Sequence, residues 1–183
     1  FARPVYVLED QVTLYEILSE EEVRLGMDPL ALQGENLLVN AGFEEVDATG
    51  KPVDWVAHNK EGGFATAGQA YGGSVAVASA GDRHSWSQVV PITPEQLYAT
   101  GMWVRSEEDG KLARLQILWW DENHELINVS ARLIFTDRQW RWVEMPASAP
   151  AEARFAEIYA TAHNEDTVWI DEMCFAEGPT CQP

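Results

Sequence analysis

Short runs of alternating apolar and polar residues dominate the chain from Asn36 onward. They recur every 8–14 residues and are separated by Gly, Pro, Asp and Asn. Because no helical pattern lies between them, they predict an all-β jelly-roll sandwich of two antiparallel sheets. The predicted strands lie near 36–40, 53–58, 63–67, 73–79, 84–91, 97–105, 111–121, 125–135, 140–146, 153–162 and 166–176.

The first 35 residues have a different pattern. Residues 4–8 read as a short strand, and residues 12–25 read as a helix with leucine and isoleucine on one face and glutamate on the other. We therefore expect an N-terminal strand–helix extension over 1–35, a β-sandwich over 36–177 and a short tail over 178–183.

Composition narrows the possible partners. The net charge is −18, from 12 basic and 30 acidic residues, so a nucleic-acid binder is not expected and anionic membrane surfaces are disfavoured. No run of 18 apolar residues exists, so we expect no membrane insertion. Neutral ligands and divalent cations remain compatible with this charge.

The two cysteines, Cys174 and Cys181, leave two alternatives open. They are close enough in sequence to close a small disulfide loop in an oxidising compartment, or they are two free thiols.

Alternation within the predicted strands separates a core face from an open face. It places Val89 in the core, together with the set that contains Tyr98, Met102, Leu115 and Ile158. We also expect Trp55, Trp119 and Trp142 to be mostly buried. The open face is predicted to carry Trp86, Trp103, Arg105, Arg114, Gln116, Trp120 and Tyr159.

That open face has the chemistry of a carbohydrate site. The apolar C–H faces of sugar rings stack on indole and phenol rings, and sugar hydroxyls need planar donors and acceptors such as Arg and Gln. The alternative is that these rings are covered by loops, by the first 35 residues or by a partner domain.

Sequence motifs for catalysis are absent. Gly72-Gly73-Ser74-Val75-Ala76 lacks the final glycine of a nucleophile elbow, and the four histidines have no metal-ligand spacing such as H-E-x-x-H. We therefore expect a binding or accessory domain and not an enzyme.

Two acidic residues mark the ends of the β region. Glu44 follows its first predicted strand, and Asp171 lies where alternation breaks in the last one, which predicts a bulge. Because first and last strands of a sandwich are commonly neighbours, Glu44 and Asp171 form a candidate calcium site with nearby backbone carbonyls. Otherwise they are solvated surface acids.

The order of these motifs resembles the carbohydrate-binding modules related to families 4, 9 and 22. The likeness begins at Asn36-Leu37-Leu38-Val39-Asn40-Ala41-Gly42-Phe43-Glu44 and covers about 140 residues. It continues through Gly73-Ser74, Trp86-Ser87-Gln88-Val89, 98–104, Trp119-Trp120-Asp121, Trp140, Ala149-Pro150 and Ile170-Asp171-Glu172-Met173.

The resemblance implies a jelly roll with a glycan cleft on its concave sheet. It also implies a structural calcium held by Glu44 and Asp171, with carbonyl ligands from the neighbourhood of residues 71–73. Asp171-Glu172 stands where the family commonly has Asp-Asp, which leaves the first acid intact.

Two functions follow as hypotheses. The first is a non-catalytic, extracytoplasmic module that binds an oligo- or polysaccharide. The second is a structural or protein-interaction accessory domain that contacts other domains of a larger cell-surface protein, such as the soluble end of a membrane glycosyltransferase, which the N-terminal segment weakly resembles.

Overall fold

A computed structural model describes residues 2–6, 13–17, 34–58, 64–67, 69–80, 85–163 and 166–181. It divides into two compact units, Phe1–Leu32 and Gln33–Pro183. Among the residues in these ranges, no helix has the length and apolarity needed to cross a membrane.

The N-terminal unit contains a β-hairpin. Strands β1 (Ala2–Tyr6) and β2 (Thr13–Ile17) pair antiparallel, with Ala2 opposite Ile17. The strand expected at 4–8 is confirmed as far as Tyr6, and residues 7–8 lie outside the described residues. The helix expected over 12–25 is wrong for 13–17, because Thr13, Tyr15 and Ile17 are strong β-formers whose backbone groups pair with β1. Residues 18–25 lie outside the described residues.

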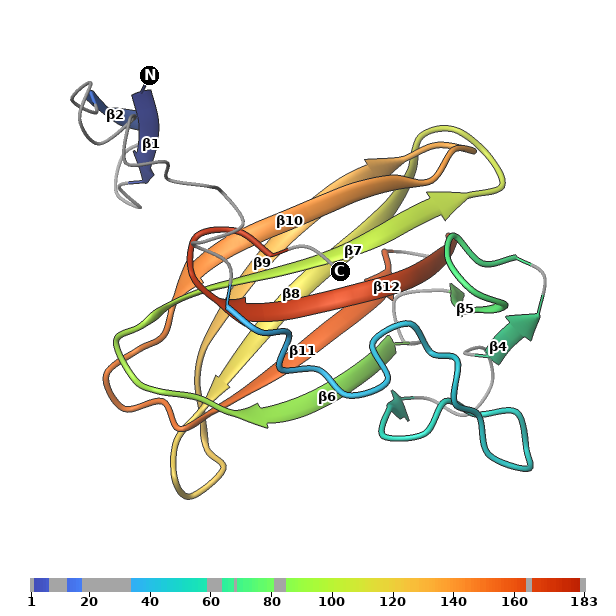
Figure 1. The fold of residues 1–183 in the computed structure, drawn as a ribbon, viewed down its shortest axis with the longest axis horizontal. Helices are drawn as coiled ribbons and strands as arrows, with labels where there is room; N and C mark the ends of the chain where they lie inside the picture. Colours follow the sequence, from blue (N-terminus) through green and yellow to red (C-terminus); the bar gives the residue numbers. More distant parts are fainter. Residues whose placement is uncertain are drawn as a thin grey trace. The chain divides into compact units, whose positions relative to one another are not determined.

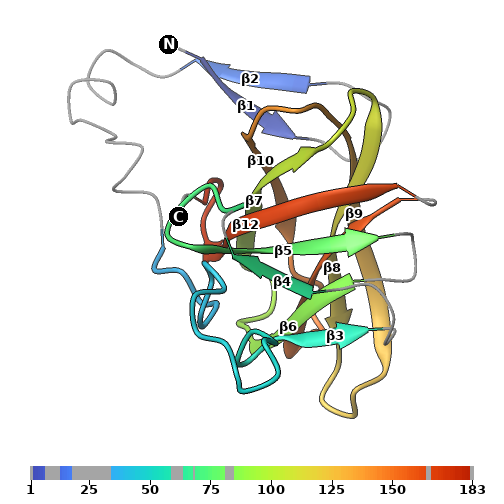
Figure 2. The same cartoon turned by 90° about the vertical axis from the view of Figure 1, so that its right-hand side faces the viewer.

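The second unit is a sandwich of two five-stranded antiparallel sheets, as predicted (Figures 1 and 2). We call them the β7 sheet and the β8 sheet. The β7 sheet has the order β10 (Arg141–Ser148), β7 (Leu97–Ser106), β12 (Thr167–Glu177), β5 (Val75–Ala80), β4 (Phe64–Ala67). The β8 sheet has the order β3 (Val56–His58), β6 (Ser85–Pro91), β11 (Phe155–Ala162), β8 (Lys111–Trp120), β9 (Leu126–Thr136).

The first segment of the sandwich lies beside β12 but is not a strand, so the strand expected at 36–40 is wrong. The amide of Leu37 donates to the carbonyl of Phe175 (2.7 Å), which confirms that the two segments are neighbours. The Asn36 side chain then bonds to Met173 and Phe175, in place of backbone groups, and Asn40 adopts a left-handed conformation (φ 49°). These two features end the ladder.

The core lies between the sheets and follows the predicted alternation in β7, β8 and β11. Tyr98, Met102, Leu115 and Ile158 are buried there, as are Trp55 and Trp119. Trp142 is partly buried, in agreement with the prediction, but it packs outside this core. It lies on the outer face of the β7 sheet, the face directed away from the core.

In β6 the predicted faces are reversed. Trp86 is 1 % exposed and Val89 is 50 % exposed. The β6–β11 register sets Trp86 opposite Ala160, whose side chain faces the core, and the Trp86 indole N–H donates to the carbonyl of Ala78 (3.0 Å). Ala78 belongs to the other sheet, so Trp86 joins the two layers.

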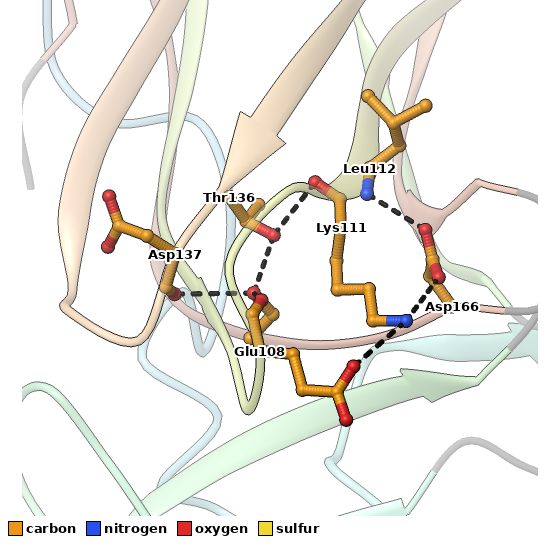
Figure 3. A network of polar contacts seen from close by, with 7 residues as sticks. Glu108, Lys111, Leu112, Thr136, Asp137 and Asp166 are labelled. Atoms are coloured by element: carbon orange, nitrogen blue, oxygen red, sulfur yellow. Dashed lines mark hydrogen bonds and ion pairs between the residues drawn. The ribbon is translucent and has the colours of Figure 1, made fainter.

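A polar network holds one end of the sandwich (Figure 3). Nζ of Lys111 lies 3.2 Å from Oδ1 of Asp166 and 3.4 Å from Oε2 of Glu108. The amide of Leu112 donates to Oδ2 of Asp166. That amide, followed by Lys111, lowers the pKa of Asp166. The contacts tie the start of β8 to the segment before β12, and so hold the β7–β8 turn in place.

Cys174 and Cys181 form a disulfide, with Cα atoms 5.9 Å apart. This decides the alternative that the sequence left open. The bridge lies in a small cluster with Ala99 and Ala176, against which Trp142 packs.

Candidate functional site

The predicted carbohydrate residues do not share one face. Trp86 lies in the core. Trp103 and Arg105 point outward from the β7 sheet, because their neighbours Met102 and Val104 face the core. The outward residues of the β8 sheet are Arg114, Gln116, Trp120 and Tyr159. The prediction of a single face fails because β7 and β8 are consecutive strands of different sheets, so their outer faces are opposite.

Tyr159 is central to the outer face of the β8 sheet. It lies opposite Gln116 on one side and Ser87 on the other. Its hydroxyl is 3.1 Å from Nε2 of His58, and the two rings are 4.9 Å apart. Ser87 is 2.7 Å from the same nitrogen and donates to Glu157 (2.9 Å). Each polar group in this row therefore has a fixed orientation.

Burial, followed by the negative charge of Glu157, raises the pKa of Tyr159 to about 12. Its hydroxyl therefore stays protonated at ordinary pH. The Ser87–His58–Glu157 group differs from a catalytic triad, because Ser87 and Glu157 both face Nε2 of His58. In a triad the carboxylate lies at the other ring nitrogen and orients the base.

Two donors on this face have no partner among the described residues. They are Nε of Arg114 and Nε1 of Trp120, both buried. Arg114, Gln116, Leu118 and Trp120 follow one another on the outward side of β8, over about 20 Å.

The edge strand β9 adds an apolar stripe to the same face. Val129, Leu133 and Phe135 lie opposite Leu118, Arg114 and Leu112 of β8. All three β9 residues are exposed, and Phe135 reaches 69 %. The outer face of the β8 sheet is thus polar along β11 and apolar along β9.

The outer face of the β7 sheet carries an aromatic cluster. Tyr71 stacks on Trp103 with ring centroids 3.7 Å apart, and Trp140 meets Tyr71 at a steep angle. The Arg105 guanidinium lies 5.3 Å from the ring of Trp140 and 5.9 Å from that of Trp169.

Three carboxylates converge on the loop that carries Tyr71. Oδ2 of Asp171 accepts from the amides of Tyr71 (2.7 Å) and Gly72 (3.1 Å). Oε1 of Glu44 accepts from the amides of Ser74 and Val75, at 2.8 Å each. A Cβ atom on Gly72 would lie 2.5 Å from Oε1 of Glu172, so the loop passes close to that carboxylate too.

Asp171 is buried, and the ladder between β12 and β7 shifts register between Asp171 and Cys174, as the broken alternation predicted. Burial raises the pKa of Asp171 to about 6, whereas the amides of Gly72, Glu172 and Tyr71 lower it. A buried carboxylate of this kind is stabilised by a cation or by a proton.

The predicted calcium ligands, Glu44 and Asp171, thus approach the same loop. Within the described ranges, however, no three His, Cys, Asp or Glu side chains form a metal-binding group by themselves. The donor set therefore fits calcium only if backbone carbonyls complete it, as calcium sites commonly allow.

Sequence reasoning missed several of these residues. Tyr71 lies in a turn beside two glycines, where no periodic pattern exists. His58 and Glu157 reach the face of Tyr159 only through pairing between strands distant in sequence. For Trp140, the outward position just before β10 was a usable signal, since the alternation of β10 extends to it.

The comparisons with known proteins place the fold. No model of a known protein family matches the chain. No curated protein matches it either. Solved structures do match: the xylan-binding domain CBM22-1 of Xyn10C from Paenibacillus barcinonensis superposes with a TM-score of 0.59 at 18 % identity, covering 80 % of this chain and 97 % of that one.

A second match is TmCBM61, solved with β-1,4-galactotriose, with a TM-score of 0.56 at 22 % identity, covering 77 % of this chain and 97 % of that one. A third is the enzymatically active domain of tailspike protein 4 from bacteriophage CBA120, with a TM-score of 0.61 at 13 % identity. The match covers 78 % of this chain but only 21 % of the tailspike chain. At these identities the likeness establishes the fold, a jelly roll of the carbohydrate-binding-module type.

Proposed function

We propose that the domain is a non-catalytic module that binds an oligo- or polysaccharide on the outer face of the β8 sheet. The observation that carries this proposal is the row formed by Ser87, Tyr159 and Gln116 on adjacent strands. It places an aromatic ring between oriented polar groups on an open sheet.

The chemistry of the row supports a neutral sugar. The ring of Tyr159 offers an apolar surface for sugar C–H groups, and Gln116 can both donate to and accept from hydroxyls. Nε of Arg114 and Nε1 of Trp120 are donors without a partner among the described residues. Both nitrogens are buried, so a ligand oxygen would pair with them only if the two side chains change rotamer, and that pairing would then add affinity.

The test is binding of β-1,4-galactotriose and of xylan oligosaccharides, measured by calorimetry. Tyr159→Ala removes the ring and Tyr159→Phe removes only its hydroxyl, so the pair separates stacking from hydrogen bonding. We expect about a tenfold loss of affinity for the alanine variant and a smaller loss for phenylalanine. Glu122→Ala, in an exposed turn, is the control. If no neutral oligosaccharide binds, the proposal is wrong.

A protein-interaction role is the second candidate, because of the apolar stripe on β9. Sugars stack on aromatic rings, whereas Val129 and Leu133 offer surface of the kind that protein partners bury. The partner in this case is another domain of a larger surface protein. The double variant Leu133→Glu, Phe135→Glu would abolish such an association and leave oligosaccharide binding through Tyr159 intact. If the double variant instead weakens oligosaccharide binding, the stripe belongs to the saccharide site.

We also propose a structural calcium between Glu44 and Asp171. A bound cation would satisfy the buried Asp171 carboxylate and hold the loop at 71–75. The test is the melting temperature of the protein, measured with calcium and with a chelator. Calcium should raise the melting temperature, because an ion that binds only the folded state stabilises that state. Glu44→Gln should remove the calcium effect, and an equal effect in the variant would exclude the site.

An extracytoplasmic location completes the proposal. Its support is the Cys174–Cys181 disulfide, since such bridges persist in oxidising compartments. Thiol labelling of the protein isolated from its native source tests this, and two labelled cysteines would contradict it.

A further inference from the structure

The outer face of the β7 sheet has an aromatic platform that the proposed site does not use. Trp103 covers one face of the Tyr71 ring, yet Tyr71 remains 48 % exposed. The exposed part of a stacked aromatic pair is a surface on which a further flat group can stack. This pair lies on the opposite side of the sandwich from Tyr159.

Arg105 lies beside this platform without an acidic partner. The chain has 30 acidic residues, but none of the described ones forms an ion pair with Arg105. Instead its guanidinium is held between Trp140 and Trp169, and it donates to Gln69. These contacts hold the Arg105 side chain in place. No acidic side chain of the described residues neutralises its positive charge by an ion pair.

The platform has donors in excess of acceptors. Nε of Arg105 and Nε1 of Trp103 are both buried and have no partner among the described residues. They belong to residues two apart on β7, so both project from the same face, about 7 Å apart along the strand. The N–H groups open to a ligand are the terminal ones of Arg105 that do not donate to Gln69. A planar guanidinium matches a carboxylate, which it binds through two parallel hydrogen bonds.

We propose that this face is a second binding site, for a sugar residue that bears a carboxylate, such as a uronic acid. The sugar ring stacks on Tyr71, and its carboxylate binds Arg105. Gln69 acts as a positioning residue, because its contact is with Arg105.

The loop geometry supports a built platform. The amide of Tyr71 donates to Asp171, which lies opposite Trp103 in the β12–β7 ladder. Asp171 therefore positions both rings relative to the sheet: it binds the backbone of Tyr71 and pairs with Trp103 across the ladder. Asp171 is itself buried and accepts hydrogen bonds from the loop amides, so its carboxylate is not exposed on the surface of the platform.

The overall charge of −18 does not prevent such binding. At physiological ionic strength, interactions between exposed charges fade beyond about 8 Å. The carboxylate of a bound sugar would therefore respond chiefly to Arg105, whereas a long polyanion would meet repulsion from the rest of the surface. We expect short acidic oligosaccharides to bind better per residue than long ones.

The experiment is calorimetric titration of the full chain with short oligogalacturonate and, separately, with β-1,4-galactotriose. Tyr71→Ala and Arg105→Gln should each weaken oligogalacturonate binding about tenfold, because each removes a stacking or charged hydrogen-bonding partner. Tyr71→Phe should keep binding, since it retains the ring. Tyr159→Ala should leave oligogalacturonate binding unchanged, and should weaken only the galactotriose.

The two proposals can therefore fail separately. Absence of oligogalacturonate binding, or binding that Arg105→Gln and Tyr71→Ala leave intact, overturns the second site whatever the neutral sugar does. Equal affinity of this face for the two sugars overturns the carboxylate assignment. Should Arg105→Gln lower the melting temperature, Arg105→Lys decides: it keeps the charge but loses the planar fork, and unchanged affinity contradicts bidentate recognition.

Discussion

Trp103 on β7 and Tyr159 on β11 point away from each other, from the two opposite outer faces of the sandwich. The whole core lies between them, with Met102 and Ile158 among its buried residues. A ligand that contacts one ring therefore cannot contact the other.

Substitutions on the two faces should act independently. We expect Tyr159→Ala to lower affinity for neutral oligosaccharides about tenfold and Trp103→Ala to leave that affinity unchanged, since distant sites with no shared partner are additive. Calorimetry of both single variants and the double variant checks this. A loss with Trp103→Ala equal to that with Tyr159→Ala would mean that the ligand wraps the sandwich edge.

Trp86 should matter for stability and not for binding. Trp86→Ala removes a buried indole and its hydrogen bond to Ala78, and we expect it to lower the free energy of unfolding by about 3–5 kcal/mol. Urea unfolding measures the change. Val89 is on the same strand but exposed, so Val89→Ala should lower the free energy of unfolding far less. A similar loss for both variants would contradict the observed faces of β6.

Gly101 allows Trp142 to lie flat on the outer face of the β7 sheet. A Cβ atom there would be 2.2 Å from Cζ2 of Trp142, so Gly101→Ala must displace the ring. We expect a loss of about 1–3 kcal/mol in the free energy of unfolding. Gly101→Ala combined with Trp142→Leu should lose less than the sum of the two single changes, and simple additivity would contradict the contact.

Reduction of the Cys174–Cys181 disulfide should destabilise the sandwich. The bridge closes a short loop with a sequence separation of 7, for which loss of the constraint on the unfolded chain costs about 2–3 kcal/mol. Thermal unfolding with and without reductant measures this. The Cys174→Ala, Cys181→Ala double variant should match the reduced protein and be insensitive to reductant.

Asp171 should make stability fall as pH rises in the metal-free protein. Burial raises its folded pKa to about 6, above the ordinary value of 3.8, so the folded state binds the proton more tightly than the unfolded state does. This contribution is present below about pH 4 and is lost as pH rises through about 6. Bound calcium would reverse the trend, because it favours the charged form.

The measurement is the free energy of unfolding in chelator at several pH values, for wild type and Asp171→Asn. The difference between them isolates Asp171, because Asp47, Asp121 and Asp166 have lowered pKa values and act in the opposite sense in both proteins. A wild-type protein that gains stability relative to Asp171→Asn between pH 4 and 6 would contradict the raised pKa.

Much of the architecture could be predicted because strands carry a local signal. Alternation in β7, β8 and β11 identified Tyr98, Leu115 and Ile158 as core, and the break at Asp171 identified the bulge. The prediction of the buried face of β6 was wrong because Trp86 and Val89 are both apolar. Alternation separated the two faces of the strand but did not show which of them faces the core. Its partner Ala160 decided that.

The sequence by itself determined the fold class and the bulge at Asp171, since each depends on the pattern of residues close together in the chain. The tertiary structure alone decided which outward residues share a surface. Side chains alternate along a strand, but the surface they reach depends on the sheet to which the strand belongs. That is why Trp103 and Tyr159, alike in pattern, lie on opposite outer faces of the sandwich.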